Sequence, residues 1–234
     1  MEQPASFKPA PAACEYRPDQ QSQLYYELTW QLTTIEYSQR LKEGWRRFGP
    51  VVFRPECPEC RRCQSLRVSV TEFRASRSQR RAWERNERAL ELRIGEPVID
   101  PDRLELFARF HEHGHQAKGW PAPDDDELRL KIHVTNPFPT EEWSYWLDGK
   151  LVGLGYVDVL PAGLSAIYFV HRPEEHRRSI GTFNILKMIE STRRRGLPHV
   201  YLGYYVDGCR SLEYKAAFTP NEVLKGGQWT ALRR

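Results

Sequence analysis

The spacing of apolar residues divides the chain into strand-like and helix-like segments. Short apolar runs, rich in branched and aromatic residues and separated by turn residues, predict a meander of three strands at 143–147, 151–160 and 164–170. After a polar segment, apolar residues recur every third position from Ile180 to Ile189, which predicts an amphipathic helix that Ser179 caps and Gly196 ends. Another apolar run predicts a strand at 200–206. This β-β-β-α-β order indicates an α+β fold.

The N-terminal half shows shorter segments of the same two kinds. Strands are expected at 23–33, 51–53 and 65–73, and helices at 37–47, from Ser76 or Ser78 to about Leu90, and at 102–115. Residues 1–13, rich in Pro and Ala, are expected to form a disordered tail, and the acidic, Pro-bearing segment 121–131 a mobile loop.

Composition narrows the class of protein. With 234 residues, 12% aromatic, the chain is long enough for a packed core. A net charge of +4 permits a nucleic-acid partner without requiring one. The N-terminus has no apolar signal segment, and no run approaches the roughly 18 apolar residues of a membrane span, so we expect a cytoplasmic protein without a membrane partner.

The cysteines suggest a metal site. Their odd number, five, without an export signal argues against a disulfide framework. Cys57, Cys60 and Cys63 follow a C-x-x-C-x-x-C pattern, which lets neighbouring thiolates point at one ion, and Cys14 is the natural fourth ligand. Zinc and an iron–sulfur cluster both fit this spacing, and the alternative is a set of reduced structural thiols without metal.

The helix expected after Ser76 has a basic face. Arg77, Arg81, Arg85 and Arg88 are spaced four, four and three apart, with Arg80 beside them. Such a face can lie along a phosphate backbone. The alternative is a solvated surface on which nearby glutamates form intrahelical ion pairs.

The segment from His111 to His115 matches the H-E-x-x-H pattern of zinc proteases. We discount it, because Gly114 falls inside the turn that must hold both histidines and because residues 118–121 are expected to end the helix at once.

The start of the helix at 180 is a candidate anion site. Arg177 and Arg178 precede it, and the dipole and free amides of a helix N-terminus attract negative charge. The turn Arg178-x-x-Gly181-x-Phe183 resembles the pyrophosphate turn of GNAT acyltransferases, in which the strands flanking the helix splay apart and leave an acyl slot. Phe183 replaces a small residue of that motif, and we expect its bulk to obstruct a coenzyme A pyrophosphate.

Motifs spread over nearly the whole chain resemble the bacterial aminoacyl-tRNA–protein transferases of the N-degron pathway, the aspartate/glutamate leucyltransferases, which are relatives of the arginyltransferases. The matching stretches are Cys14, 53–63, 76–83, 157–166, 178–183, 201–204, Cys209, 213–215, 218–220 and 226–229. The resemblance implies a GNAT-like acyltransferase core at 96–234. It is preceded by an N-terminal lobe at 14–95, which contains the cysteine cluster and the basic helix.

The resemblance also implies a reaction. An amino acid, with leucine favoured and arginine the alternative, is transferred from aminoacyl-tRNA to the N-terminal Asp or Glu of a protein, which marks that protein for degradation. No cofactor is required for transfer, and we expect a monomer. Two rivals are a CoA-dependent N-acetyltransferase and a metal-containing module that binds RNA.

Site residues follow from this reaction as hypotheses. We assign Arg178 and the amides of Ser179, Gly181 and Thr182 to the substrate carboxylate or the developing oxyanion, and Lys215 to the acidic side chain. Tyr204 and Tyr214 are candidates for orienting the amine or protonating the ribose oxygen, and Asp207 for accepting a proton; packing and turn formation are the alternatives. Cys209 is expected to be a buried thiol. The residues assigned to tRNA are Arg77, Arg80, Arg81 and Arg85.

Overall fold

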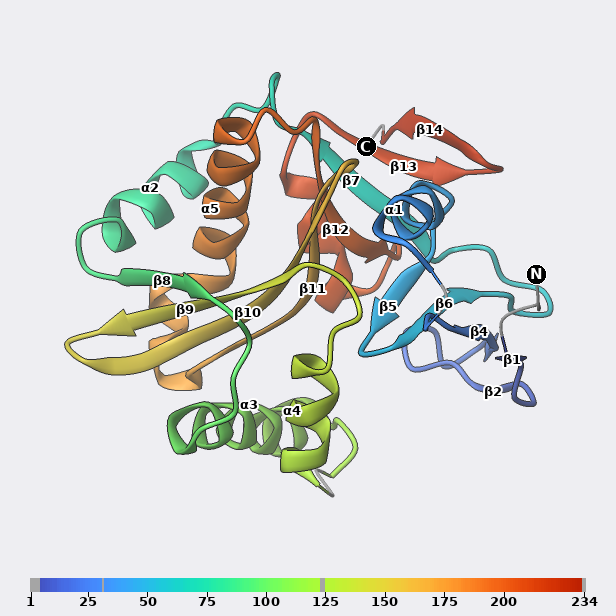
Figure 1. The fold of residues 1–234 in the computed structure, drawn as a ribbon, viewed down its shortest axis with the longest axis horizontal. Coiled ribbons are helices and arrows are strands. Elements are labelled where there is room, and N and C mark those ends of the chain that lie inside the picture. Colours follow the sequence, from blue (N-terminus) through green and yellow to red (C-terminus); the bar gives the residue numbers. More distant parts are fainter. Residues whose placement is uncertain (1–4, 31, 123–124, 233–234) are drawn as a thin grey trace.

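The computed structural model describes residues 5–30, 32–122 and 125–232 (Figure 1). It is a mixed α+β structure, as the sequence predicts, built around a sheet of eight strands. Within these residues no helix is long and apolar enough to cross a membrane. The helices are α1 (Thr34–Lys42), α2 (Arg77–Asn86), α3 (Pro101–Lys118), α4 (Asp126–Val134), α5 (Ile180–Arg194) and α6 (Arg210–Glu213), with 3₁₀ turns η1 (Pro173–Arg178) and η2 (Tyr214–Ala217).

The large sheet has the order β14-β13-β7-β12-β11-β10-β9-β8. Its strands are β7 (Gln64–Ser69), β8 (Glu91–Gly95), β9 (Thr140–Leu147), β10 (Lys150–Leu160), β11 (Gly163–His171), β12 (His199–Tyr205), β13 (Asn221–Lys225) and β14 (Gln228–Ala231). Only the β11–β12 pair is parallel; its connection runs through α5, because parallel neighbours need a long crossover. The strands predicted between residues 143 and 206 and the helix between them are confirmed.

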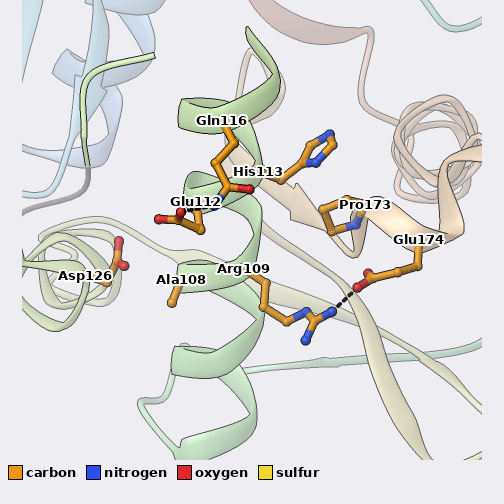
Figure 2. A pocket seen from close by; sticks show the side chains of 8 residues that line it. All are labelled: Ala108, Arg109, Glu112, His113, Gln116, Asp126, Pro173 and Glu174. Carbon is orange, nitrogen blue, oxygen red and sulfur yellow. Dashed lines mark hydrogen bonds and ion pairs between the residues drawn. The ribbon is translucent and has the colours of Figure 1, made fainter. Parts of the chain in front are cut away.

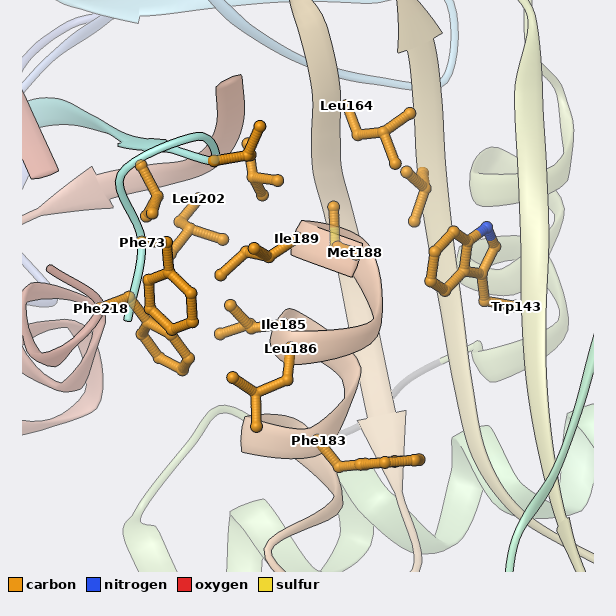
Figure 3. Packing of buried hydrophobic residues seen from close by; sticks show 14 of the residues in the cluster. Phe73, Trp143, Leu164, Phe183, Ile185, Leu186, Met188, Ile189, Leu202 and Phe218 are labelled. Atoms are coloured by element: carbon orange, nitrogen blue, oxygen red, sulfur yellow. The ribbon is translucent and has the colours of Figure 1, made fainter. Parts of the chain in front are cut away.

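Helices cover both faces of this sheet. Successive side chains of a strand point to opposite faces, so Val152 of β10 packs in the cluster around α5, whereas Leu151 packs with α3 and α4. Figure 3 shows Ile185 and Ile189 of α5 turned into that first cluster, which also holds Phe73 and Phe218. Burying each such side chain contributes roughly 1.5–3 kcal/mol, so this contact fixes α5 on the sheet.

A second, smaller sheet lies beside the first. It has the order β1-β4-β6-β5, with β1 (Ser6–Phe7), β4 (Leu24–Leu28), β5 (Arg46–Phe48) and β6 (Val51–Pro55), and a separate pair joins β2 (Ala12–Ala13) to β3 (Gln21–Ser22). Helix α1 opens with a capping box between Thr33 and Glu36. Tyr37 and Leu41 of α1 pack against Tyr201 of the large sheet, which joins the two parts of the structure.

The two central strands of the large sheet separate. β11 and β12 are paired over only three residues of each strand, from Gly163 with His199 to Ser165 with Tyr201, although both strands continue beyond this ladder. On its other side β12 is paired with β7, and the register shifts between Tyr201 and Gly203. The backbone of β11 from Ala166 onward therefore leaves its parallel neighbour, and a split opens between the strands.

Three expectations for the N-terminal half differ from the structure. The helix predicted at 37–47 ends at Lys42, so Arg46 and Arg47 lie in strand β5. Part of the predicted tail is an edge strand, because β1 pairs with β4; residues 1–4 lie outside the described residues. β7 and β8, placed in the N-terminal lobe by the sequence, belong to the large sheet.

Two further expectations were wrong for reasons of packing. The segment 121–131, expected to be an acidic loop, includes the first residues of helix α4, and its residues 123–124 lie outside the described residues. Asp125 caps α4 by accepting from the Leu128 amide at 2.8 Å, and the buried Leu130 holds the helix in place. Phe183 does not obstruct the turn before α5. Its ring is 1% exposed and packs 5.5 Å from Trp83 and 5.9 Å from Tyr145, because its position on α5 faces the core.

Candidate functional site

Two cationic side chains lie at the split between β11 and β12. Arg46 of β5 donates from Nη2 to the carbonyl of Ala166 at 2.5 Å, and Ala166 is the first residue of β11 past the paired segment. Lys215 of η2 donates from Nζ to the carbonyl of Tyr204 in β12 at 2.8 Å. The elements that reach the split are thus a strand of the small sheet and a turn that follows β12.

Gly203 brings these two cations close to the backbone of β12. A Cβ at this position would lie 3.6 Å from Lys215 Nζ and 3.7 Å from both Nε and Nη2 of Arg46. Its φ of +81° lies in the region that favours glycine. The absence of a side chain therefore leaves the space beside both cations open.

Burial and the neighbouring Arg46 guanidinium together lower the pKa of Lys215 from 10.5 to about 7. Near neutral pH a substantial fraction of Lys215 is therefore the free amine, which can accept a proton. The protonated fraction can pair with an anion. One side chain thus offers two kinds of chemistry at the split.

The other predicted residues near this end of β12 have different surroundings. The Tyr204 hydroxyl donates to the carbonyl of Gly44 at 3.0 Å, which ties β12 to the chain before β5, and burial raises the pKa of this phenol. Tyr214 is half exposed. Asp207 is exposed and accepts a hydrogen bond from the Tyr205 hydroxyl at 3.3 Å. The catalytic roles expected for Tyr204, Tyr214 and Asp207 stay predictions.

The start of α5 forms a separate basic depression. A hollow of about 650 Å³ is lined by Arg85 of α2 and by Glu174, Glu175, Arg177 and Arg178 of η1. Arg178 forms an ion pair with Glu175, with Nε 2.9 Å from Oε2. Arg177 is exposed and forms no ion pair with the described residues. Three guanidinium groups against two carboxylates leave this hollow with a positive balance.

Ser179 joins this hollow to α5 in an unexpected conformation. It has φ 57° and ψ 45°, and its side chain makes no capping hydrogen bond, so the sequence prediction of a side-chain cap is wrong. Gly181 and Thr182 lie in the first turn of α5, where backbone N–H groups lack intrahelical acceptors. The anion-binding role assigned to these amides stays a prediction that fits their position.

Arg178 and Lys215 are not brought together. Arg178 follows the far end of β11, whereas Lys215 lies near the level of Ala166, where the split begins. The five residue-to-residue steps from Ala166 to His171 span roughly 16 Å at the rise of a strand. The two cations therefore serve different parts of any substrate.

Helix α2 is fixed to η1 on the side next to the hollow. Asn86, fully buried, donates from Nδ2 to the carbonyl of Arg178 at 2.8 Å, and Arg85 donates to the carbonyl of Arg177. The capping box of Ser76 and Gln79 starts this helix.

The outward face of α2 carries the predicted basic residues. Glu87 pairs with Lys187 of α5 at 3.4 Å instead of with an arginine of its own helix. In the part of the chain that the structure describes, no ion pair neutralises any of these exposed arginines, so the intrahelical pairing of the alternative interpretation is not found. The arginines are Arg77, Arg80, Arg81 and Arg85 of α2 and Arg88, which follows it, because the helix expected to reach about Leu90 ends at Asn86.

The cysteines gather in one region. Burial and the nearby thiols of the other four cysteines raise the pKa of Cys63 to about 12, and Cys209 from the far end of the chain is among them. Among the described residues, however, no group of three or more His, Cys, Asp or Glu side chains is arranged so that it could hold a metal ion. The metal site at Cys14, Cys57, Cys60 and Cys63 therefore stays a prediction, and Cys209 is the buried thiol expected.

The H-E-x-x-H segment lies in α3 beside a second hollow of about 730 Å³, which Figure 2 shows with the Arg109–Glu174 ion pair at its edge. His111 bonds the Tyr168 hydroxyl at 2.7 Å, whereas His115 bonds the carbonyl of Trp120 at 2.8 Å. The two histidines face different partners. The helix continues past Gly114, whose missing side chain makes room for Trp120.

Arg46 is the residue of the site that sequence reasoning missed. Its neighbour Arg47 has the same side chain, and both fell inside a predicted helix. The only available signal was that two adjacent arginines in a strand must point to opposite faces.

Most of this chain is similar in sequence to proteins of known families. A sequence model described as arginine-tRNA-protein transferase, N terminus, matches residues 12–81, and the corresponding C-terminus model matches residues 102–225. Among solved structures, one of FemX covers 62% of this chain and 54% of its own, with 9% identity and a TM-score of 0.48.

Curated bacterial relatives share a name. The aspartate/glutamate leucyltransferase of Marinobacter nauticus is 37% identical over 95% of this chain and 94% of its own length. Those of Pseudomonas fluorescens and Campylobacter jejuni are 34% and 33% identical, and cover 95% and 91% of this chain and 94% and 90% of their own lengths. The chain therefore belongs to the arginine-tRNA-protein transferase family and is an aminoacyl-tRNA-dependent transferase.

Proposed function

We propose that this protein transfers leucine from leucyl-tRNA to the α-amine of proteins that begin with Asp or Glu. The observation that carries the proposal is the match, over 95% of the chain, to relatives named aspartate/glutamate leucyltransferase. Arginine is the alternative donor amino acid, supported by the description of the family models. The product would be a protein marked for N-degron degradation.

The core that performs this transfer is GNAT-like. Support comes from the order β9-β10-β11-α5-β12 and from the short ladder that joins β11 and β12 before they separate. The split accommodates the aminoacyl ester, and the hollow before α5 accommodates a phosphate of the tRNA acceptor end. The exposed arginines of α2 continue this basic surface away from the split and bind the tRNA backbone.

In the reaction the α-amine attacks the ester carbonyl, a C–N bond forms, and the C–O bond to the ribose breaks. An α-amine has a pKa of about 8, so a sizeable fraction is already nucleophilic near pH 7. The attacking nitrogen loses a proton as the amide forms. The departing ribose oxygen is protonated in turn, and no cofactor takes part in transfer.

The rival functions differ in their donor. The buried position of Phe183 removes the steric argument against coenzyme A, so the N-acetyltransferase reading is tested directly, by titration with acetyl-CoA. A module that only binds RNA leaves the pair Arg46 and Lys215 without a role, because neither lies on the exposed face of α2.

The decisive experiment incubates the protein with a peptide that begins with Asp and with separately charged leucyl- and arginyl-tRNA. Mass spectrometry of the peptide then shows which residue is added. We expect leucine addition that requires charged tRNA; addition of an acetyl group from acetyl-CoA, or of nothing, would overturn the proposal.

Two further parts of the proposal concern the protein itself. We propose a monomeric cytoplasmic enzyme, since its donor substrate is cytoplasmic; light scattering after gel filtration tests the oligomeric state. We also propose zinc or an iron–sulfur cluster at Cys14, Cys57, Cys60 and Cys63, supported by the gathering of these thiols around Cys63. Metal content of anaerobically purified protein, compared with a Cys57→Ser/Cys60→Ser variant, decides this, and equal content in both would exclude the site.

A further inference from the structure

Arg46 is a buried cation without a counter-charge. Its side chain belongs to a residue that is only 6% exposed. A guanidinium has five N–H donors, and the one bond found within the described residues joins Nη2 to the Ala166 carbonyl. Among these residues it forms no ion pair. Burying a charge is costly unless it is paired, so this arrangement needs an explanation.

The adjacent Arg47 shows what a structural arginine in the same strand looks like. It points to the other face of β5, where both partners of its ion pair with Asp158 are fully buried. Its guanidinium also donates to the Gly49 carbonyl at 2.9 Å and to Thr140 Oγ1 at 2.8 Å. The fold therefore neutralises the charge of Arg47 and leaves the charge of Arg46 unpaired beside the split.

The second cation makes the open charge more notable. Lys215 also lacks an ion pair among the described residues, and it faces Arg46 across Gly203. Two like charges in a partly desolvated site repel each other, and an anion between them removes that repulsion. A single carboxylate fits this need, since its two oxygens can accept from the guanidinium and from the ammonium together.

We propose that Arg46 and Lys215 form the subsite for the side-chain carboxylate of the N-terminal Asp or Glu of the acceptor, and that Arg46 distinguishes these residues from Asn and Gln. This inference rests on the proposed function. Arg46 is buried and lies where β11 leaves β12, a position that suits a short side chain of a peptide end better than a bulky group. A tRNA phosphate is better matched by the exposed arginines of α2, which need no desolvation.

The proposal predicts a loss confined to acidic acceptors. Peptides that begin with Asp or Asn and are otherwise identical are compared as substrates of the wild type and of Arg46→Gln. For the Asp peptide we expect kcat/KM to fall about 10- to 100-fold, the range of one lost charge-assisted hydrogen bond. For the Asn peptide we expect a change below about threefold, because no carboxylate is lost. Arg46→Lys, which keeps the charge, should restore part of the preference for Asp.

A matched control separates this effect from a general loss of charge. Arg54 lies on the neighbouring strand β6 and is already paired with Glu56. Arg54→Gln should leave the Asp/Asn ratio unchanged. Thermal unfolding of each variant, followed by circular dichroism, shows whether Arg46→Gln is folded. If it is not, the ratio of kcat/KM for the Asp and Asn peptides is measured in Arg46→Lys and Lys215→Met instead.

A second measurement keeps this inference distinct from the proposed function. Calorimetric titration of the enzyme with the two peptides, in the absence of tRNA, should show tighter binding of the Asp peptide and loss of that preference in Arg46→Gln. This result would support the subsite even if no transfer occurred. Equal losses for both peptides, or a loss seen only as a higher KM for the aminoacyl-tRNA, would overturn it, the latter in favour of a tRNA phosphate.

Discussion

Removing two arginines, Arg81 of α2 and Arg88 just after this helix, tests how the enzyme holds tRNA. Both residues are exposed, and in the described part of the chain their side chains form neither ion pairs nor hydrogen bonds. Changing both to Gln should therefore leave the fold intact and remove only their charge. If both contact phosphates, each also releases counterions on binding.

The magnitude follows from counterion release. Each lost phosphate contact lowers the slope of log affinity against log salt by roughly 0.7 to 0.9, so the double variant should lose about 1.5. At 0.1 M salt this corresponds to roughly 30-fold weaker binding, and the two proteins should converge toward 1 M. Fluorescence anisotropy of labelled tRNA over a series of KCl concentrations measures both quantities.

A control with the same change in net charge excludes a non-specific effect. Arg93 and Arg194 are already paired, with Glu91 and Glu190, so Arg93→Gln/Arg194→Gln should keep the wild-type slope. If the α2 variant also kept that slope and its low-salt affinity, α2 would not contact the tRNA backbone.

Three other predictions concern charged groups inside the fold. The pKa of Lys215 is lowered from 10.5 to about 7, so between these pH values the unfolded state binds more protons and the free energy of unfolding rises with pH. Lys215→Met should reduce that rise, measured by urea titrations at several pH values. An unchanged rise would show that this lysine is not desolvated. Burial lowers the pKa of His133 to about 4, so stability is lost as the pH falls from about 6.5 toward 4. His133→Phe keeps an aromatic ring in place of the imidazole, whose centroid lies 4.5 Å from that of Tyr168, and should make the melting temperature depend less on pH in this range. An equally strong dependence in this variant would assign the loss to other groups. Asp158→Asn leaves Arg47 buried without its counter-charge and should cost about 3–5 kcal/mol in chemical denaturation; a cost near zero would mean that the pair is hydrated in solution.

The order of elements from residue 140 to 206 was predictable because it follows from local periodicity and turn residues. Alternating or wholly apolar strands, and a helix with one apolar face, can be recognised from a few consecutive residues. Helix α4 could not be recognised in this way, because Leu130 is its only fully buried residue in the described structure and the acidic residues before it resemble a solvated loop. Its stability comes from packing against α3, which the local sequence does not contain.

The site could be predicted only in part. Lys215 and Arg178 were found through motifs, but the distance between them depends on where β11 leaves β12. Arg46 has no local feature that distinguishes it from Arg47, since its role depends on which face of β5 meets the split. Phe183 was misjudged for the same reason, because the direction of a helical side chain is set by the sheet beneath it.

The most direct test of the account is a transfer assay with purified protein, charged tRNA and two peptides that differ only in beginning with Asp or with Asn. We expect the Asp peptide to gain one leucine residue in mass, only when leucyl-tRNA is present, and the Asn peptide to react much more slowly. Equal reaction of the two peptides, or no mass gain with any charged tRNA, would contradict it.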